Sequence, residues 1–148
     1  MMTIPYRIYK IETNEFASFP ENYSRDSKFK LRIGFQFEVA YPQPIIRCKS
    51  LFTGLDDMNM PIFKLIVSCY FAIEPKAYQG MITGNTITIP ADFLRYMAMI
   101  STGTARGILH TKLEKGEMSD YVLAPVNLQN IIKKDYVADL NLKREPED

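Results

Sequence analysis

Residues 28–41, KFKLRIGFQFEVAY, constrain the fold more than any other part of this sequence. The odd positions all hold large apolar residues: Phe29, Leu31, Ile33, Phe35, Phe37, Val39 and Tyr41. A strict period of two places these side chains on one face of a β-strand, whereas a helix would scatter them around its axis. Ordering such a strand costs about as much free energy as burying its side chains returns, so it is not stable alone. The sequence therefore predicts further strands beside it and an apolar layer over its odd face.

Three other segments predict strands of the same sheet. Residues 4–19 alternate imperfectly, residues 45–53 alternate weakly, and residues 62–73 carry apolar side chains on both faces. Residues 20–27, PENYSRDS, are polar turn material that joins the first strand to the second. Short links between successive strands favour antiparallel pairing, because parallel neighbours need crossovers of about a dozen residues or more.

The periodicity changes in the second half of the chain. Residues 74–88 predict a mobile connection, and the apolar period after them, about 3.6, is typical of a helix. Gly103 and Gly107 indicate where this helix bends or ends, since glycine costs roughly 1 kcal/mol in a helix interior. Asn127 is a good N-cap for a last helix over residues 128–140. Strands followed by helices predict an α+β fold with one sheet face covered and the other free.

Composition narrows the class of protein. The 148 residues predict one domain, residues 1–148, with a frayed tail at 143–148. A net charge of +1 creates no field that would attract nucleic acid or an anionic membrane. No apolar run is long enough for membrane insertion, and the N-terminus lacks the apolar core of a signal peptide, so a cytoplasmic location is expected. Cys48 and Cys69 predict two buried thiols in a reducing compartment.

The sequence contains no motif that predicts an enzyme. His110 is the only histidine, and neither a nucleophile elbow nor a suitably spaced carboxylate makes it a catalytic base. TGNT at 83–86 and STGT at 101–104 lack the lysine and the strand-to-helix context of a phosphate-binding loop. No pattern of metal ligands is present, and no cofactor is expected. A small-ligand site would need an enclosed polar pocket near His110 or Asn127.

Three segments of the second half resemble the SecB family of protein-export chaperones. They are IPADF at 89–93, STGT at 101–104 and LAPVNL at 123–128. In that family a helix ends in a Gly-Thr pair, and an Ala-Pro-Val-Asn segment leads into a second helix. The order of elements is similar too, with a crossover loop after the first strand. The resemblance implies a SecB-like α+β fold, a four-stranded antiparallel sheet with two helices packed on one face.

The resemblance also implies a function. Members of the family are ATP-independent holdases, homotetramers built as dimers of dimers, whose apolar grooves hold unfolded polypeptides. Apolar burial is non-directional, so such a groove accepts many sequences. By position, the client-binding surface would comprise Phe19, Tyr23, Phe29, Leu31, Ile33, Ile131 and Tyr136. Each of these residues has an alternative interpretation as ordinary core.

The charged positions leave the role within the family open. Glu15 matches one acidic position through which export members contact the translocation motor SecA, and it is the predicted motor contact here. The later acid of the first strand falls on Phe19 and that of the fourth strand on Lys64, which lowers electrostatic complementarity with SecA. SecB-like proteins that chaperone an antitoxin in toxin–antitoxin systems share the fold without the full motor-binding surface. Both roles, export holdase and dedicated antitoxin chaperone, remain candidates.

Overall fold

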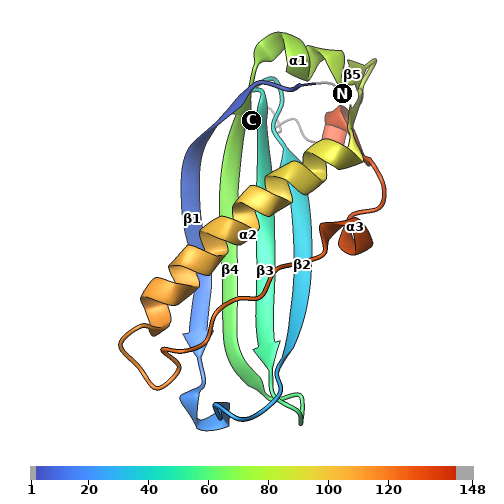
Figure 1. Cartoon of the computed structure of the whole chain (residues 1–148). Helices are drawn as coiled ribbons and strands as arrows, with labels where there is room; N and C mark the ends of the chain where they lie inside the picture. Colours follow the sequence, from blue (N-terminus) through green and yellow to red (C-terminus); the bar gives the residue numbers. More distant parts are fainter. Residues whose placement is uncertain (1–2, 143–148) are drawn as a thin grey trace.

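The computed structural model describes residues 3–142 and contains one antiparallel four-stranded sheet with the order β1-β4-β3-β2 (Figure 1). Its strands are β1 (Tyr6–Ser18), β2 (Lys30–Val39), β3 (Ile45–Leu55) and β4 (Pro61–Ile73). Between β1 and β2 the chain passes from one edge of the sheet to the other through a short 3-10 helix, η1 (Pro20–Asn22). The four predicted strands and their antiparallel pairing are thus confirmed.

The strand register gives the sheet one apolar face. Phe35 of β2 lies opposite Ser50 of β3, which in turn lies opposite Val67 of β4. Odd positions of β2 and β4 therefore share a face with even positions of β3. Phe52 of β3 and Phe71 of β4 lie on this face with 0% of their surface exposed. The prediction that the odd face of residues 28–41 turns toward the core is confirmed.

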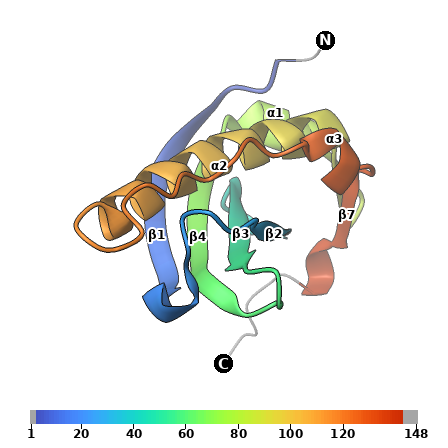
Figure 2. The ribbon, with the colours of Figure 1, turned by 60° about the horizontal axis from the view of Figure 1, so that its bottom comes forward.

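A long helix, α2 (Ala91–Leu113), runs diagonally across the apolar face (Figures 1 and 2). Its buried apolar side chains pack into the same core as those of β3 and β4: Phe93, Leu94, Met97, Ala98, Ala105, Leu109 and Leu113. The helix continues through Gly103 and Gly107 to Leu113, so the prediction that it ends at one of these glycines is wrong. Both glycines are exposed, and a Cβ added to either would meet nothing within 4 Å.

Residues 74–88 form regular structure rather than a bare connection. They contain α1 (Pro75–Gly80), β5 (Ile82–Thr83) and most of β6 (Thr86–Ile89). The Glu74 carboxylate accepts a hydrogen bond from the Ala77 N–H at 2.7 Å and so caps α1. Tyr78 is buried, and its hydroxyl donates to the Ala40 carbonyl oxygen at 2.5 Å.

The prediction of a last helix over residues 128–140 is wrong. Only one turn, α3 (Leu128–Ile131), is helical, and a strand, β7 (Tyr136–Asp139), and a 3-10 turn, η2 (Leu140–Leu142), follow it. β7 pairs with β6, so that β5, β6 and β7 form a second, three-stranded sheet. The resemblance implied two helices packed on one face of the large sheet; within residues 3–142 the second of them is only the single turn α3. The predicted frayed tail lies outside the described residues.

An extended segment, residues 114–127, accompanies α2 on the same side of the large sheet (Figure 2). Leu123 is 1% exposed, and its carbonyl oxygen accepts a hydrogen bond from Arg106 Nε of α2 at 2.7 Å. This hydrogen bond therefore holds residues 114–127 against α2. None of the helices within residues 3–142 is long and apolar enough to cross a membrane.

Candidate polypeptide-binding surface

Five apolar side chains in β2 and just before it are only partly covered. We call the β2 strip the row formed by Phe29, Leu31, Ile33, Phe35 and Phe37, each of which is half-buried. By contrast, Cys48 and Phe52 of the neighbouring strand are 0% exposed. The difference arises because β2 is an edge strand and α2 contacts β3 and β4 instead. The strip therefore presents apolar surface along one edge of the sheet.

At one end the β2 strip joins a cluster of aromatic rings. Tyr23 stacks on Phe29 with ring centroids 5.1 Å apart, and Tyr121 contacts both rings edge-on. The Tyr23 hydroxyl donates to Asp120 Oδ1 at 2.7 Å. Burial and this acidic partner raise the pKa of Tyr23 to about 12, and the hydrogen bond from Tyr23 lowers the pKa of Asp120. The crossover segment after β1 and the segment after α2 thus meet here.

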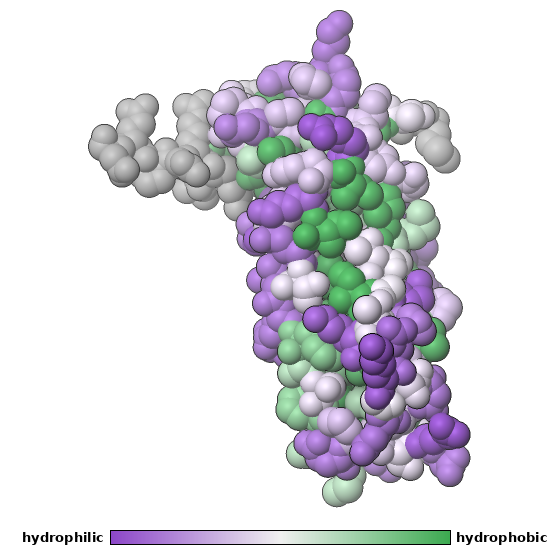
Figure 3. Space-filling view, turned by 90° about the vertical axis from the view of Figure 1, so that its left-hand side faces the viewer, coloured by the Kyte–Doolittle hydropathy of each residue, from purple (hydrophilic) through white to green (hydrophobic). Residues whose placement is uncertain are grey.

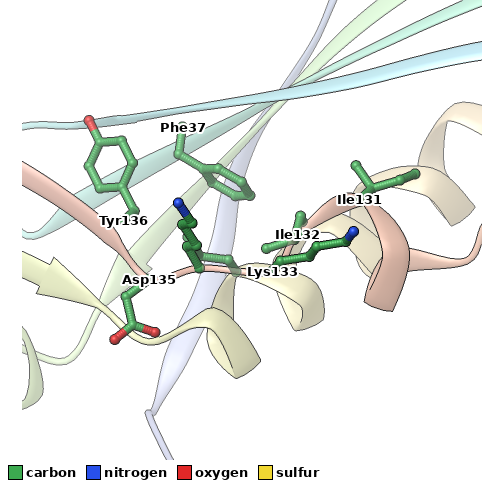
Figure 4. A pocket seen from close by; sticks show the side chains of 8 residues that line it. Phe37, Ile131, Ile132, Lys133, Asp135 and Tyr136 are labelled. Carbon is green, nitrogen blue, oxygen red and sulfur yellow. The ribbon is translucent and has the colours of Figure 1, made fainter.

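At the other end the β2 strip opens into a hollow of about 350 Å³ (Figure 4). We call it the β2–α3 hollow; its lining residues are Phe37, Leu94, Ile131, Ile132, Lys133, Lys134, Asp135 and Tyr136. The rings of Phe37 and Tyr136 lie 6.5 Å apart, centroid to centroid. Ile132 is buried, whereas Ile131 is 40% exposed. The hollow thus combines an apolar wall with charged residues.

Hydrogen bonds to the start of α2 fix the chain that forms this hollow. Arg95 Nη1 donates to the Ile132 carbonyl oxygen at 2.7 Å, and Arg95 also bonds the Asp92 carboxylate. Asp135 Oδ1 accepts a hydrogen bond from the Ala91 N–H at 2.8 Å. A carboxylate in this position is stabilised by the positive end of the helix dipole. The lining of the hollow is therefore anchored from two sides.

The structure places six of the seven predicted client-binding residues along this surface. Leu31, Ile33 and Phe29 belong to the β2 strip, Tyr23 to the aromatic cluster, and Ile131 and Tyr136 to the hollow. Phe19 is half-buried beside η1, where its backbone N–H donates to the Ile62 carbonyl oxygen at 2.8 Å.

Sequence reasoning missed other residues of this surface. Phe37 was identifiable, because it continues the period of two that marks Leu31 and Ile33. Tyr121, Leu94 and the two lysines of the hollow come from separate segments, so no local pattern relates them to β2.

Glu15 lies on the opposite, uncovered face of the sheet. Its carboxylate forms an ion pair with Lys64, with 3.3 Å between Glu15 Oε1 and Lys64 Nζ. The Glu15 side chain is 47% exposed and that of Lys64 is 45% exposed. The predicted motor contact is therefore paired with Lys64 in the structure.

The remaining candidate chemistry is sparse. The His110 imidazole is exposed, and its Nε2 lies 3.6 Å from a Glu114 carboxylate oxygen. Cys48 and Cys69 are buried, free thiols that lie opposite each other in the β3–β4 register, as predicted for buried thiols. Within residues 3–142, no group of His, Cys, Asp and Glu side chains is arranged to hold a metal ion.

A second apolar surface lies at the other edge of the sheet. We call it the β1–α2 patch; its members are exposed apolar residues of β1 and α2, namely Ile8 (41%), Ile11 (50%), Tyr96 (43%) and Met99 (54%). Ile8 and Ile11 lie opposite Phe71 and Cys69, so they are on the face that α2 covers. A hydrogen bond from the Tyr6 hydroxyl to that of Tyr96, 3.2 Å long, links the two elements. Figure 3 shows apolar side chains gathered on this side of the molecule.

The arrangement of the sheet and its diagonal helix is similar to the fold of a SecB-like chaperone. A solved structure supports this, the Mycobacterium tuberculosis Rv1957 SecB-like chaperone in complex with a ChAD peptide from the Rv1956 HigA1 antitoxin. The match has a TM-score of 0.50 and covers 82% of this chain and 90% of that one, with 6% sequence identity. No family model and no curated protein matches the sequence. At this identity the likeness shows the shared fold.

Proposed function

We propose that this protein is a molecular chaperone that holds one dedicated protein client, such as the antitoxin of a toxin–antitoxin system. The observation that carries the proposal is the half-buried β2 strip in a chain with the fold of a SecB-like chaperone. The similar structure holds an antitoxin peptide, which favours a dedicated client over unfolded polypeptides in general.

The dimensions of the β2 strip suit an extended polypeptide. From Phe29 to Phe37 the strip spans about 26 Å, at roughly 3.3 Å per residue. Alternate side chains of an extended client would meet it, with the aromatic cluster at one end and the β2–α3 hollow at the other. Fully covering a large apolar side chain contributes about 1.5–3 kcal/mol, so covering what remains exposed of the strip contributes a part of the binding free energy.

The charges on the uncovered sheet face disfavour an export role. Glu15 is paired with Lys64, and Phe19 occupies another position where export members carry an acid. A contact with SecA would then lack most of its electrostatic complementarity. A general export holdase is the second candidate, because the β2 strip is apolar throughout and apolar burial selects weakly among sequences.

Co-purification with variants of the strip tests the proposal. Ile33→Asp places a carboxylate in the middle of the β2 strip, while Met58→Asp, at a residue that is 80% exposed in the β3–β4 turn, is the matched control. The wild type and the control are expected to retain one protein in stoichiometric amount, and Ile33→Asp is expected to lose it. Many weak partners would favour the general holdase. No partner, together with no suppression of the aggregation of reduced α-lactalbumin, would contradict both functions.

We further propose that a second copy of the chain covers the β1–α2 patch in a homotetramer, a dimer of dimers. The patch supports this, since neighbouring exposed apolar side chains mark interaction sites. β1 is also an edge strand whose outer backbone groups have no partner strand within residues 3–142. Light scattering should give a mass about four times that of the 17.1 kDa chain. A mass of one chain at all concentrations would exclude the assembly.

A cytoplasmic location is part of the proposal. Cys48 and Cys69 are neighbours across β3 and β4, yet both are free thiols. Free, adjacent thiols suit a reducing compartment. Fractionation of the native host, with a periplasmic or secreted marker as control, checks this location.

A further inference from the structure

Two lysines at the β2–α3 hollow have no acidic partner. Lys133 and Lys134 are exposed, and neither forms an ion pair within residues 3–142. Both belong to the lining of the hollow. In Figure 4 the Lys133 side chain extends alongside Ile132 and Ile131, so its charge lies next to apolar surface.

The acidic groups around the hollow are already engaged elsewhere. Asp135 accepts a hydrogen bond from the Ala91 N–H, and Asp92 bonds Arg95. The Glu38 carboxylate, whose charge contributes to raising the pKa of Tyr136, accepts a hydrogen bond from Arg47 Nη2 at 2.7 Å. The charged side chains that line the hollow are Lys133, Lys134 and Asp135, two positive and one negative, so the lining carries a net charge of +1.

We infer that the β2–α3 hollow selects client segments in which an apolar residue is flanked by carboxylates. The apolar side chain enters between Phe37, Ile131 and Tyr136, and Asp or Glu residues beside it pair with Lys133 and Lys134. This inference rests on the proposed function and names the chemistry of the client. Its basis is charge complementarity, because the rim carries two unpaired cations and the wall is apolar.

The physical expectation is a modest preference that depends on salt. Exposed ion pairs are weak, so two of them change affinity about two- to thirtyfold. Such pairs weaken as the Debye length falls from about 10 Å at 0.1 M salt to about 3 Å at 1 M. Apolar contacts in the hollow keep their strength over this range, so salt separates the two contributions.

Three labelled peptides test the inference by fluorescence anisotropy. They share one extended apolar sequence and differ only in the two residues beside a central leucine, which are Asp, Gln or Lys. The wild type is expected to bind the Asp peptide about two- to thirtyfold more tightly than the Gln peptide, and the Lys peptide most weakly. The difference is expected to disappear at 1 M salt.

Protein variants then assign the preference to the two lysines. Lys133→Gln/Lys134→Gln should bind the Asp and Gln peptides equally, and Lys133→Glu/Lys134→Glu should prefer the Lys peptide. Lys76→Gln/Lys115→Gln removes the same charge from exposed sites outside the hollow and should keep the wild-type preference. Because all these side chains are exposed, folding is expected to be intact, and circular dichroism checks it.

The outcomes separate this inference from the proposed function. Equal binding of all three peptides by the wild type, or a preference that survives Lys133→Gln/Lys134→Gln, would overturn the inference and leave the chaperone function standing. If the wild type binds none of the three peptides, this inference is overturned, whereas the dedicated-client function is overturned only by the co-purification and aggregation tests described above. Binding that Ile33→Asp abolishes while Lys133→Gln/Lys134→Gln removes only the charge preference would support both.

Discussion

At the scale of the residue, Gly54 has less space for a side chain than Gly34, the other glycine of the large sheet. It lies in β3 opposite Phe63, and a Cβ there would come within 2.7 Å of Phe63 Cδ1 and 2.8 Å of Ile62 Cγ1. Both neighbours are 0% exposed, so neither can move without disturbing the core. The absence of a side chain at this position is thus a packing requirement.

Gly54→Ala is expected to lower the free energy of unfolding by about 1–3 kcal/mol, because overpacking forces the buried ring to shift. Urea denaturation measures the change. Gly34→Ala is the matched control, since its Cβ would lie 3.8 Å from Leu51 Cδ1, an ordinary contact. The control should change stability by less than about 0.5 kcal/mol. Equal urea midpoints for both variants would contradict this prediction, because they would show that the core around Gly54 accommodates a methyl group without loss of stability.

Cys48 makes stability depend on pH at the alkaline end. Burial raises the pKa of its thiol to about 12, against 9.0 as its ordinary value. Above pH 9.0 the unfolded chain releases this proton while the folded chain keeps it, so the free energy of unfolding falls as pH rises toward 12. At about pH 10.5 the loss from this thiol is about 2 kcal/mol.

Urea denaturation of the wild type and Cys48→Ala, at about pH 8 and about pH 10.5, isolates this contribution. Removal of the buried sulfur lowers stability at both pH values, but Cys48→Ala should lose about 2 kcal/mol less between them. Tyrosines titrate in both proteins and cancel in the comparison. Identical losses in the two proteins would mean that the buried thiol ionises as readily as an exposed one.

At the scale of the element, β2 and β3 differ in how completely the same apolar face is covered. Phe35 and Phe52 are neighbours on that face, with ring centroids 6.2 Å apart, but Phe35 is half-buried and Phe52 is 0% exposed. Phe52→Asp is expected to cost more than about 4 kcal/mol, since a buried carboxylate is left without a partner. Phe35→Asp should cost about 1–3 kcal/mol, because its carboxylate reaches water.

Thermal and urea denaturation of the two variants check this difference between the strands. Phe35→Asp is also expected to weaken peptide binding, which the proposed chaperone function requires. A cost for Phe35→Asp as large as that for Phe52→Asp would mean that the β2 strip is as deeply buried in solution as β3.

The sheet could be predicted from the sequence because its signal is local. In residues 28–41 each apolar side chain is two positions from the next, and the pairing of β2 with β3 needs only the short turn between them. Helix propensity alone did not predict where α2 ends. The packing of Ala98 and Ala105 on the core outweighs the unfavourable helix propensity of Gly103 and Gly107.

The error at the last helix has a specific cause. Leu128, Ile131 and Ile132 satisfy a helical period, and Asn127 is a good cap residue, but its side chain makes no capping hydrogen bond. The short alternation of β7 is stabilised by β6, about fifty residues earlier in the chain, where Ile87 lies opposite Ala138. A local window cannot detect such a partner. The β2–α3 hollow depends on the same contact, so its lysines could not be predicted either.

At the scale of the whole molecule, the two apolar surfaces lie at opposite edges of one sheet. The strand order places β1 at one edge and β2 at the other. A partner that covers Ile11 and Met99 would therefore leave Ile33 and Phe37 accessible. The proposed assembly through the β1–α2 patch and the proposed client binding through the β2 strip are compatible in one particle, and each can be disrupted separately.

Met99→Glu separates assembly from client binding. Met99 is 54% exposed in the β1–α2 patch, and a carboxylate there would be buried without a partner in the assembly, at a cost of about 2–5 kcal/mol per interface. Light scattering should then show the mass of one or two chains where the wild type shows four. Its melting temperature should depend less on protein concentration, because assembly stabilises the folded chain by mass action.

Val122→Glu is the matched control, since Val122 is 66% exposed and lies outside the β1–α2 patch. It should assemble like the wild type, and the free chain should tolerate either substitution within about 0.5 kcal/mol. Dissociated Met99→Glu should still bind the peptides that the β2 strip holds, with the affinity per chain of the wild type. Loss of peptide binding together with assembly would place the client site between chains, and equal assembly of both variants would remove the β1–α2 patch as the contact.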